Sequence, residues 1–253
     1  ESLREGVAVS ATDLEGKNSK YLPFEEGETG IVYCKNAFLD FRVEKRNGSE
    51  LHFISGENLY DQPFETFVRV GNRYEEKVIR VSFSPTRKYQ IDSVSYDWSQ
   101  FSSFDYMLEP VEQVEVNTLD ASSPATVYFY PYKNSARIVE FYMQYGGWGG
   151  DENDLRKLLG DAASQVEIPD IVSGTPGLYG TKVSFCHHEQ RLDAGLDKEL
   201  KVSKTVEAGK HVRLEVYNGI EQYHVPYKAY LSNSLTGKKL EISGTLSSKR
   251  PFN

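Results

Sequence analysis

The chain has 253 residues, and its 29 Lys and Arg residues against 37 Asp and Glu residues give a formal net charge of −8. Binding a phosphate backbone requires a concentrated basic face, which an acidic chain without Lys/Arg clusters does not offer, so we expect no nucleic-acid partner. The longest apolar runs, such as residues 31–34, are strand-sized, and we therefore expect no membrane-spanning helix.

Alternating apolar and polar residues predict β-strands along most of the chain. In residues 38–43, Leu39, Phe41 and Val43 share one face. Similar alternation, with β-branched and aromatic residues, occurs in residues 65–70, 77–83 and 126–130. Turn-forming pairs such as Asn47-Gly48 separate these stretches. The sequence predicts an elongated all-β fold with long antiparallel strands and one short helix.

Three features bear on the compartment of the protein. Asn47-Gly48-Ser49 is an N-glycosylation sequon in a predicted turn, although Asn-Gly is also a common turn pair. Cys34 and Cys186 either form a disulfide or remain two thiols. The first residue is Glu1 rather than Met, which is typical of a processed mature end or of a trimmed chain. We expect a secreted or extracellular protein, with any cell-surface anchor lying outside these 253 residues.

Residues 93–106 are rich in serine and aromatic side chains. Tyr96, Trp98 and Phe101 form either an exposed patch that contacts a sugar, a lipid headgroup or a protein, or part of an ordinary core. We take Trp98 and Phe101 as candidate residues of a binding tip.

A change of composition at residues 105–112 predicts a domain boundary. The aromatic, serine-rich run ends there, and a new strand begins at Val111. We therefore divide the chain into a β-rich N-terminal recognition domain at residues 1–108 and a second β domain at residues 109–253.

One helix is predicted at residues 151–160. The acidic run 151–154 caps its first turn, and Gly160 ends it. Its apolar side chains recur at helical spacing and are Leu155, Leu158 and Leu159. The preceding glycine-rich residues 146–150 contain Trp148, a second candidate binding tip, and lack the Lys-Ser or Lys-Thr pair of a phosphate-binding loop.

No catalytic or metal-binding motif is recognisable. Cys186-His187-His188-Glu189 is the densest group of metal-ligand types, but alternate residues of a strand face opposite sides, so at most two of the four could bind one ion. Nucleophile elbows, zinc-binding helices and kinase motifs are missing from the sequence. We therefore expect a protein that is not an enzyme and uses no cofactor or metal.

The most regular strands lie between residues 202 and 246. Val212, Leu214 and Val216 share one face, and after the turn at Asn218-Gly219 the chain returns as a second strand. Residues Tyr223, Val225, Tyr227, Ala229 and Leu231 share one face of that strand, with His224, Pro226, Lys228 and Tyr230 on the other. Because proline cannot donate to a β-ladder, Pro226 predicts a sheet edge or a bulge.

These strands resemble the C-terminal signature of the aerolysin-like β-pore-forming superfamily, in its epsilon-toxin, mosquitocidal-toxin and natterin-like branches. The matching residues are Val206, Gly209, Lys210, Val212, Leu214 and Val216, followed by Val225, Pro226, Tyr227 and Ala229. The resemblance extends over residues 111–246, and its specific part is the last 45 or so residues. It covers the C-terminal half of the chain only.

The resemblance implies a non-enzymatic protein with an N-terminal recognition domain that assembles into a membrane barrel. Pore formers of this family carry a Ser/Thr-rich amphipathic hairpin, and a membrane-spanning strand needs about 9–11 alternating residues. Residues 137–168 do not show that pattern, because a capped helix interrupts them. We therefore expect a cell-surface binding or adhesion protein on an aerolysin-like scaffold, with a pore-forming toxin or defence protein as the alternative.

Self-association is the first partner that we expect, and a surface protein, a glycan or a membrane surface is the second. Exposed strand edges and aromatic side chains are common means of such contacts. Beside the edge that Pro226 predicts, the candidate interface residues are Tyr217, Tyr223, Lys228 and Tyr230.

Overall fold

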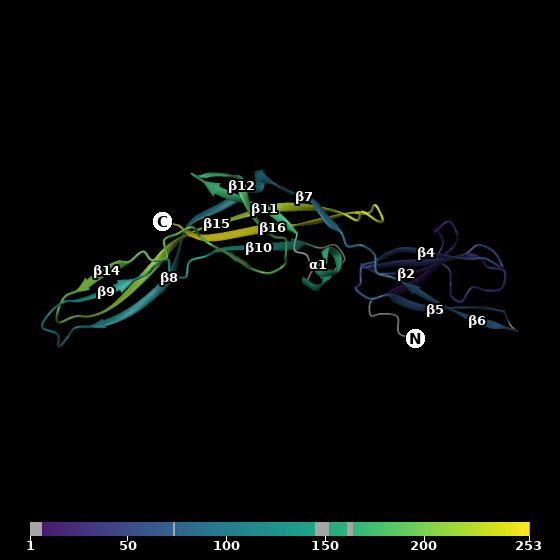
Figure 1. Ribbon diagram of the computed structural model, residues 1–253, viewed down its shortest axis with the longest axis horizontal. Helices are drawn as coiled ribbons and strands as arrows, with labels where there is room; N and C mark the ends of the chain where they lie inside the picture. The colour runs from purple at the N-terminus through teal and green to yellow at the C-terminus, as the bar shows by residue number, and fades with distance from the viewer. Residues whose placement is uncertain (1–6, 73, 145–151, 161–163, 253) are drawn as a thin grey trace. The chain divides into compact units, whose positions relative to one another are not determined.

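The computed structural model describes residues 7–72, 74–144, 152–160 and 164–252 (Figure 1). The chain divides into two compact units. The first unit comprises Glu1–Ser93, Tyr145–Ser164 and Tyr230–Glu241, and the second comprises Val94–Gln144, Gln165–Ala229 and Ile242–Asn253. This division differs from the predicted boundary at residue 108, because segments that are distant in sequence pair with one another.

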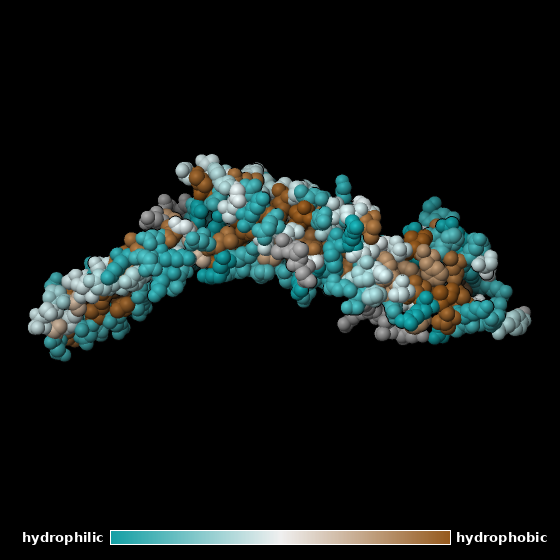
Figure 2. Space-filling view, viewed as in Figure 1, coloured by the Kyte–Doolittle hydropathy of each residue, from teal (hydrophilic) through white to brown (hydrophobic). Residues whose placement is uncertain are grey.

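A β-sandwich forms most of the first unit. Its four-stranded antiparallel sheet has the order β1 (Ala8–Thr12), β2 (Gly30–Lys35), β3 (Leu39–Lys45) and β4 (Leu51–Asn58). A two-stranded ribbon is formed by β5 (Phe64–Gly71) and β6 (Glu76–Phe83). Figure 2 shows hydrophobic residues gathered over these strands, with hydrophilic residues around them.

The alternation of β3 builds the core of that sandwich. Leu39, Phe41 and Val43 are buried, as their spacing predicts, and the ring of Phe41 contacts Phe64 and Phe83 of the ribbon at centroid distances of 6.1 and 6.3 Å. Removal of these apolar side chains from water is the main stabilising contribution that holds the ribbon to the sheet.

Helix α1 (Glu152–Leu159) also belongs to the first unit, and it confirms the predicted helix. Acidic residues occupy its first turn, and Leu155 and Leu158 are buried. Gly160 follows it with a positive φ of 76°, a conformation that glycine adopts without strain, and its amide donates to the Arg156 carbonyl at 2.7 Å. Within the described residues, no helix is long and apolar enough to cross a membrane.

A six-stranded sheet dominates the second unit. The strand order is β13 (Gln190–Leu192), β10 (Arg137–Gln144), β16 (Lys239–Phe252), β15 (His211–Ser232) and β7 (Gln90–Tyr96), and β8 (Ser102–Asn117) also pairs with β15. Two ribbons complete the unit: β9 (Ala125–Phe129) with β14 (Val202–Val206), and β11 (Gln165–Val172) with β12 (Thr175–Ser184). Strands of 22, 16 and 14 residues confirm the predicted all-β fold with long antiparallel strands.

Aromatic rings fill the core of the second unit. Phe185, which follows β12, contacts Phe141 of β10 at a centroid distance of 5.0 Å and Tyr227 of β15 at 5.7 Å. Phe141 and Tyr227 meet edge to face at 5.3 Å. These contacts pack the residues after the β11–β12 hairpin against one face of the six-stranded sheet.

Pro226 does not lie at a sheet edge, which was one of the two alternatives that the sequence left open. β15 pairs with β16 on one side and with β8 and β7 on the other. The ladder to β8 ends at the pair His224↔Ser102, and the Asp97 amide then donates to the Pro226 carbonyl at 2.9 Å. Proline is tolerated here because the chain between β7 and β8 leaves the ladder as the one-turn helix η1 (Trp98–Gln100).

Candidate functional site

Three aromatic rings form a stack that leads from the core of the second unit to its surface. The Trp98 ring stacks on Phe101 with centroids 6.1 Å apart and planes 28° apart. Phe101 in turn stacks on Tyr223 at 5.1 Å and 29°. Tyr223 is 2% exposed, whereas Trp98 is 43% exposed. We call Trp98, Phe101 and Tyr223 the aromatic stack.

The turn that carries Trp98 is held by Asp97. The Asp97 carboxylate caps η1, because Oδ1 accepts the Ser99 amide at 3.1 Å and the Ser99 hydroxyl, and Oδ2 accepts the Gln100 amide group. Hydrogen bonds from Ser99 and Gln100 lower the pKa of Asp97, so this carboxylate is ionised at neutral pH. The exposed indole therefore projects from a turn with a defined conformation.

Tyr223, at the inner end of the stack, is anchored by a buried polar network. Arg137 Nη2 donates to the Tyr223 hydroxyl at 2.9 Å and to the Pro169 carbonyl at 2.8 Å, and Nη1 pairs with Asp170 Oδ2 at 2.8 Å. Arg250 reaches the other Asp170 oxygen at 2.9 Å. Arg137 Nε also donates to Ser248 Oγ at 2.9 Å. We call these five residues, Arg137, Asp170, Tyr223, Ser248 and Arg250, the Arg137 network.

Polar contacts hold the β11–β12 hairpin to the sheet. The hairpin forms a sheet of its own, and Asp170 and the Pro169 carbonyl join it to Arg137. The Tyr96 hydroxyl adds a bond of 2.8 Å to the Glu167 carbonyl. Burial raises the pKa values of Tyr96 and Tyr223, so both phenols are neutral donors at physiological pH.

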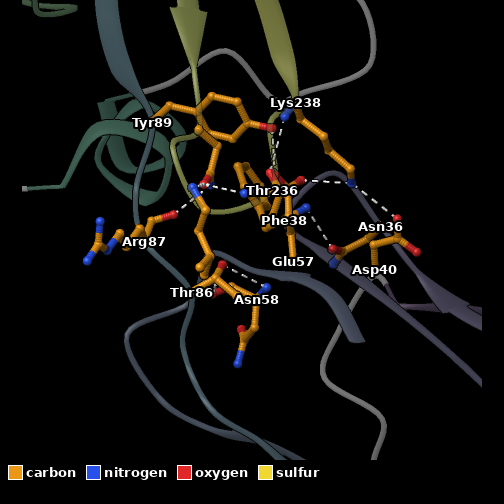
Figure 3. Close-up of polar contacts among 12 residues, drawn as sticks. Asn36, Phe38, Asp40, Glu57, Asn58, Thr86, Arg87, Tyr89, Thr236 and Lys238 are labelled. Atoms are coloured by element: carbon orange, nitrogen blue, oxygen red, sulfur yellow. Dashed lines mark hydrogen bonds and ion pairs between the residues drawn. The ribbon is translucent and has the colours of Figure 1, made fainter. Parts of the chain in front are cut away.

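A second buried polar cluster lies in the first unit (Figure 3). The Glu57 carboxylate, at the end of β4, is 6% exposed and accepts from the Tyr89 hydroxyl at 2.7 Å, Thr236 Oγ1 at 3.0 Å and Lys238 Nζ at 3.0 Å. Lys238 Nζ also reaches Asp40 Oδ2 at 3.1 Å. We call these residues, Asp40, Glu57, Tyr89, Thr236 and Lys238, the Glu57 cluster.

Two buried asparagines order the segments around this cluster. Asn58 Nδ2 donates to the Phe83 carbonyl at 2.8 Å, and Asn233 Nδ2 donates to the Arg87 carbonyl at 2.7 Å. Asn233 Oδ1 accepts the amides of Leu235 and Thr236, which shapes the turn between β15 and β16. Every oxygen of Glu57 has a donor within the protein, so the geometry indicates that this cluster holds the turn against β4.

The candidate interface residues differ in exposure. Tyr217 and Tyr230 are exposed, at 47% and 39%, and Lys228 is also exposed. Tyr223 is buried under Phe101 and bonded by Arg137, so its prediction as an interface residue is wrong.

The two cysteines are not joined in a disulfide. Cys34 is buried in the sandwich core of the first unit, where burial raises the pKa of its thiol, and Cys186 is buried in the second unit. Of the two alternatives that the sequence left open, the structure therefore has the two free thiols. Cys186 Sγ lies 3.6 Å from His188 Nε2.

The glycosylation sequon lies in the exposed loop between β3 and β4. Asn47 Oδ1 accepts the Ser49 amide at 2.8 Å and the Ser49 hydroxyl at 3.0 Å. The acceptor side chain is therefore on the surface. Trp148, the other candidate binding tip, lies outside the described residues.

Sequence reasoning did not single out several exposed aromatic residues, and Tyr21 and Tyr128 are two of them. Tyr21, in the loop between β1 and β2, is 95% exposed. Tyr128 of β9 is half exposed and has Lys201 Nζ 3.6 Å from its ring centroid. Alternation in residues 126–130 could have placed Tyr128 on the surface, whereas no periodic signal surrounds Tyr21.

Comparison with known proteins finds no family model and no curated protein that matches the chain. Among solved structures, a lamprey immune protein has 13% identity and a TM-score of 0.38, covering 98% of this chain and 89% of its own. The Mpp75Aa1.1 β-pore-forming protein from Brevibacillus laterosporus has 8% identity and a TM-score of 0.28, covering 92% and 78%. Both TM-scores are low, and neither structure defines a function for this chain.

Proposed function

We propose that the chain is a non-enzymatic extracellular protein that attaches to cell surfaces, with Trp98 at the point of contact. The observation that carries this proposal is the aromatic stack, in which an indole that is 43% exposed is held against two further rings. Burying an aromatic ring makes a large favourable contribution to the free energy of binding. A ring that is already held in place loses little conformational entropy when it binds.

The support of the stack matches what a binding residue requires. Its inner ring, Tyr223, is fixed by Arg137, and its outer turn is capped by Asp97. Precise placement of a contact side chain depends on such supporting contacts.

The exposed sequon at Asn47 supports an extracellular location. Expression through a secretory pathway should attach a glycan there, because the loop is accessible and Ser49 completes the sequon. The measurement is the intact mass before and after N-glycan removal, with Asn47→Gln as the control. An unchanged mass in the wild-type protein would contradict glycosylation at this site.

Self-association is part of the proposal and would use exposed side chains rather than a strand edge. In the described part of the chain β8 pairs with β15 alone, but its outer edge carries Glu109, Pro110 and Glu112, features that block strand addition. The exposed side chains of β15, including Tyr217 and Lys228, are the better candidates.

A pore-forming function is the second candidate, and the β11–β12 hairpin is the observation that favours it. This hairpin has its own ladder and is held to the sheet by side-chain contacts, so it could separate without breaking a ladder of the sheet. Against it, Pro169 and Pro176 lie in its strands, and Asp170 alternates with Ile168 on one face. Prolines remove ladder donors, and a charge facing lipid is costly.

Two assays on the same purified protein test the proposal. Fluorescently labelled protein should bind to cells, and liposomes loaded with a self-quenching dye should stay intact. Dye release together with ring-shaped oligomers in detergent would decide for the pore-forming function. Failure to bind any cell type, with intact liposomes, would contradict both functions.

A further inference from the structure

We propose that the exposed face of Trp98 binds an uncharged sugar ring, an inference that rests on the proposed attachment function and names its ligand class. The aromatic stack occupies one part of the indole surface and leaves close to half of the side chain in water. Trp98 also contacts the Tyr96 ring at a centroid distance of 6.1 Å, and the part of the indole that stays exposed suits a ligand that has a flat apolar face of its own.

The chain segment that carries Trp98 and Phe101 is acidic, which favours some ligands over others. Residues 89–132 contain no Lys or Arg and seven acidic residues, which are Asp92, Asp97, Asp105, Glu109, Glu112, Glu115 and Asp120. Recognition of a phosphate, sulfate or carboxylate relies on Arg, Lys or clustered backbone amides. Anionic lipid headgroups and acidic sugars therefore find no complementary charge in this segment.

The nearest basic residue of the paired strand is on the other face. The Lys228 carbonyl of β15 accepts a hydrogen bond from the Ser95 hydroxyl at 3.5 Å. Lys228 follows Tyr223 by five positions in the same strand. Successive side chains of a strand alternate between faces, so Lys228 and the Tyr223 end of the stack lie on opposite sides. Next to Trp98 in the chain, the charged side chain is the Asp97 carboxylate.

Polar groups next to the indole suit sugar hydroxyls. The Asp97 carboxylate is ionised and solvent-exposed. Each carboxylate oxygen can accept two hydrogen bonds, and Oδ2 accepts one from Gln100, so it can accept another. Ser99, Ser102 and Ser103 are also exposed. A pyranose has C–H groups on its face and hydroxyls at its edge, so its face would stack on Trp98 while its hydroxyls bond to Asp97 and these serines. A purely apolar partner would instead leave the carboxylate without a bond when it is buried.

The test reads binding at Trp98 directly. In a Trp148→Phe background Trp98 is the only tryptophan, so its fluorescence and its indole N–H resonance report on this site alone. The first step is an array of neutral and sialylated glycans. The second is titration with the strongest neutral oligosaccharide, with its sialylated counterpart, and with phosphatidylcholine vesicles that contain or lack phosphatidylserine.

We expect the neutral oligosaccharide to shift the Trp98 signals and the sialylated form to bind at least about tenfold more weakly, since the local charge repels it. Trp98→Ala should weaken binding of the neutral oligosaccharide by about tenfold or more, and Trp98→Phe should retain part of the affinity. The control is Tyr142→Ala, which removes a 50% exposed tyrosine of β10 and should leave the affinity unchanged. Circular dichroism of each variant checks that the fold is kept.

Other outcomes overturn the inference, and they separate it from the proposed function. If no neutral glycan binds, or if only phosphatidylserine vesicles shift the Trp98 signals, the ligand class is wrong. If Trp98→Ala loses cell binding while cells stripped of their glycans still bind the wild-type protein, attachment through Trp98 stands and the sugar does not. If Trp98→Ala binds cells as the wild type does, both fail.

Discussion

The Arg137 network and the Glu57 cluster contain the same kinds of polar groups, but only the Arg137 network is connected to an exposed aromatic side chain. Each contains a buried carboxylate that accepts from a cationic side chain, and each includes a tyrosine whose hydroxyl bonds inside the cluster. The Glu57 cluster ends at Lys238, a charged side chain that also bonds to Asp40. The Arg137 network continues through Tyr223 and Phe101 to an exposed Trp98. Under the proposed function, the difference lies in the exposed ring, since the Arg137 network supports an aromatic side chain at the surface and the Glu57 cluster does not.

The largest expected effect comes from Arg137→Met. This change leaves Asp170 buried with one cationic partner instead of two and removes the donors to Tyr223 and Pro169. We expect a loss of about 3–5 kcal/mol in the free energy of unfolding, measured by denaturant titration, because removing one partner of a buried ion pair is strongly destabilising and the Pro169 carbonyl and the Tyr223 hydroxyl lose a donor as well. The exposed Arg191→Met should cost less than about 1 kcal/mol. Equal costs for the two variants would contradict the role of the network.

Glu57→Gln should have the next largest effect. The amide is isosteric but carries no charge, and it cannot accept from all three donors, so we expect a loss of about 1–3 kcal/mol. Hydrogen exchange should increase in peptides from residues 51–58 and 233–238. For Arg137→Met the increase should instead occur in residues 165–172. The exposed Glu65→Gln, which pairs with Arg80, is the control. If exchange rises in the same peptides for both variants, the two clusters do not act separately.

Alkaline pH should distinguish the clusters through Lys238. Desolvation lowers the pKa of Lys238, but its hydrogen bonds with Glu57 and Asp40 outweigh that effect and raise it. A raised pKa means that the stabilising contribution is complete below the ordinary lysine pKa of about 10.4 and is lost as the pH rises through the folded-state value. Exchange in residues 233–238 should therefore increase above about pH 10.

Lys238→Met should remove part of this alkaline dependence. Lys228→Met, a change at an exposed lysine, should leave it intact. An identical pH profile for Lys238→Met and the wild type would show that Lys238 does not contribute.

The smallest effect is expected for the exposed residues of β15. Substituting Lys228 and Tyr230 with alanine should change the free energy of unfolding by less than about 0.5 kcal/mol, since surface changes rarely do more. The same substitutions should weaken self-association in analytical ultracentrifugation and reduce aggregation of cells that display the protein. Unchanged sedimentation and aggregation would exclude these two residues from the interface.

Local patterns predicted much of the fold because they act over a few residues. The alternation of Leu39, Phe41 and Val43 placed the core face of β3, and the spacing of Leu155 and Leu158 predicted α1. Each of these elements buries one face, so the spacing of its apolar residues is enough to predict it.

Contacts between distant segments could not be predicted in this way. The edge alternative for Pro226 was wrong because the change of partner strand from β8 to β7 depends on residues more than a hundred positions away. The burial of Tyr223 depends on Arg137 and Phe101, and the choice between a disulfide and two free thiols likewise depended on contacts that local patterns do not contain. Residues 96–101 had two interpretations, an exposed aromatic patch or an ordinary core. The structure contains both, since Tyr96 is buried and Trp98 is exposed.

Cell binding of Trp98→Ala beside Tyr142→Ala tests the central claim most directly. The two variants each remove one exposed aromatic side chain from the second unit, at 43% and 50% exposure, and both should keep the fold. We predict that labelled Trp98→Ala protein loses most of its cell binding while Tyr142→Ala binds as the wild type does. Equal binding by the two variants would contradict the claim that the aromatic stack is the site of attachment.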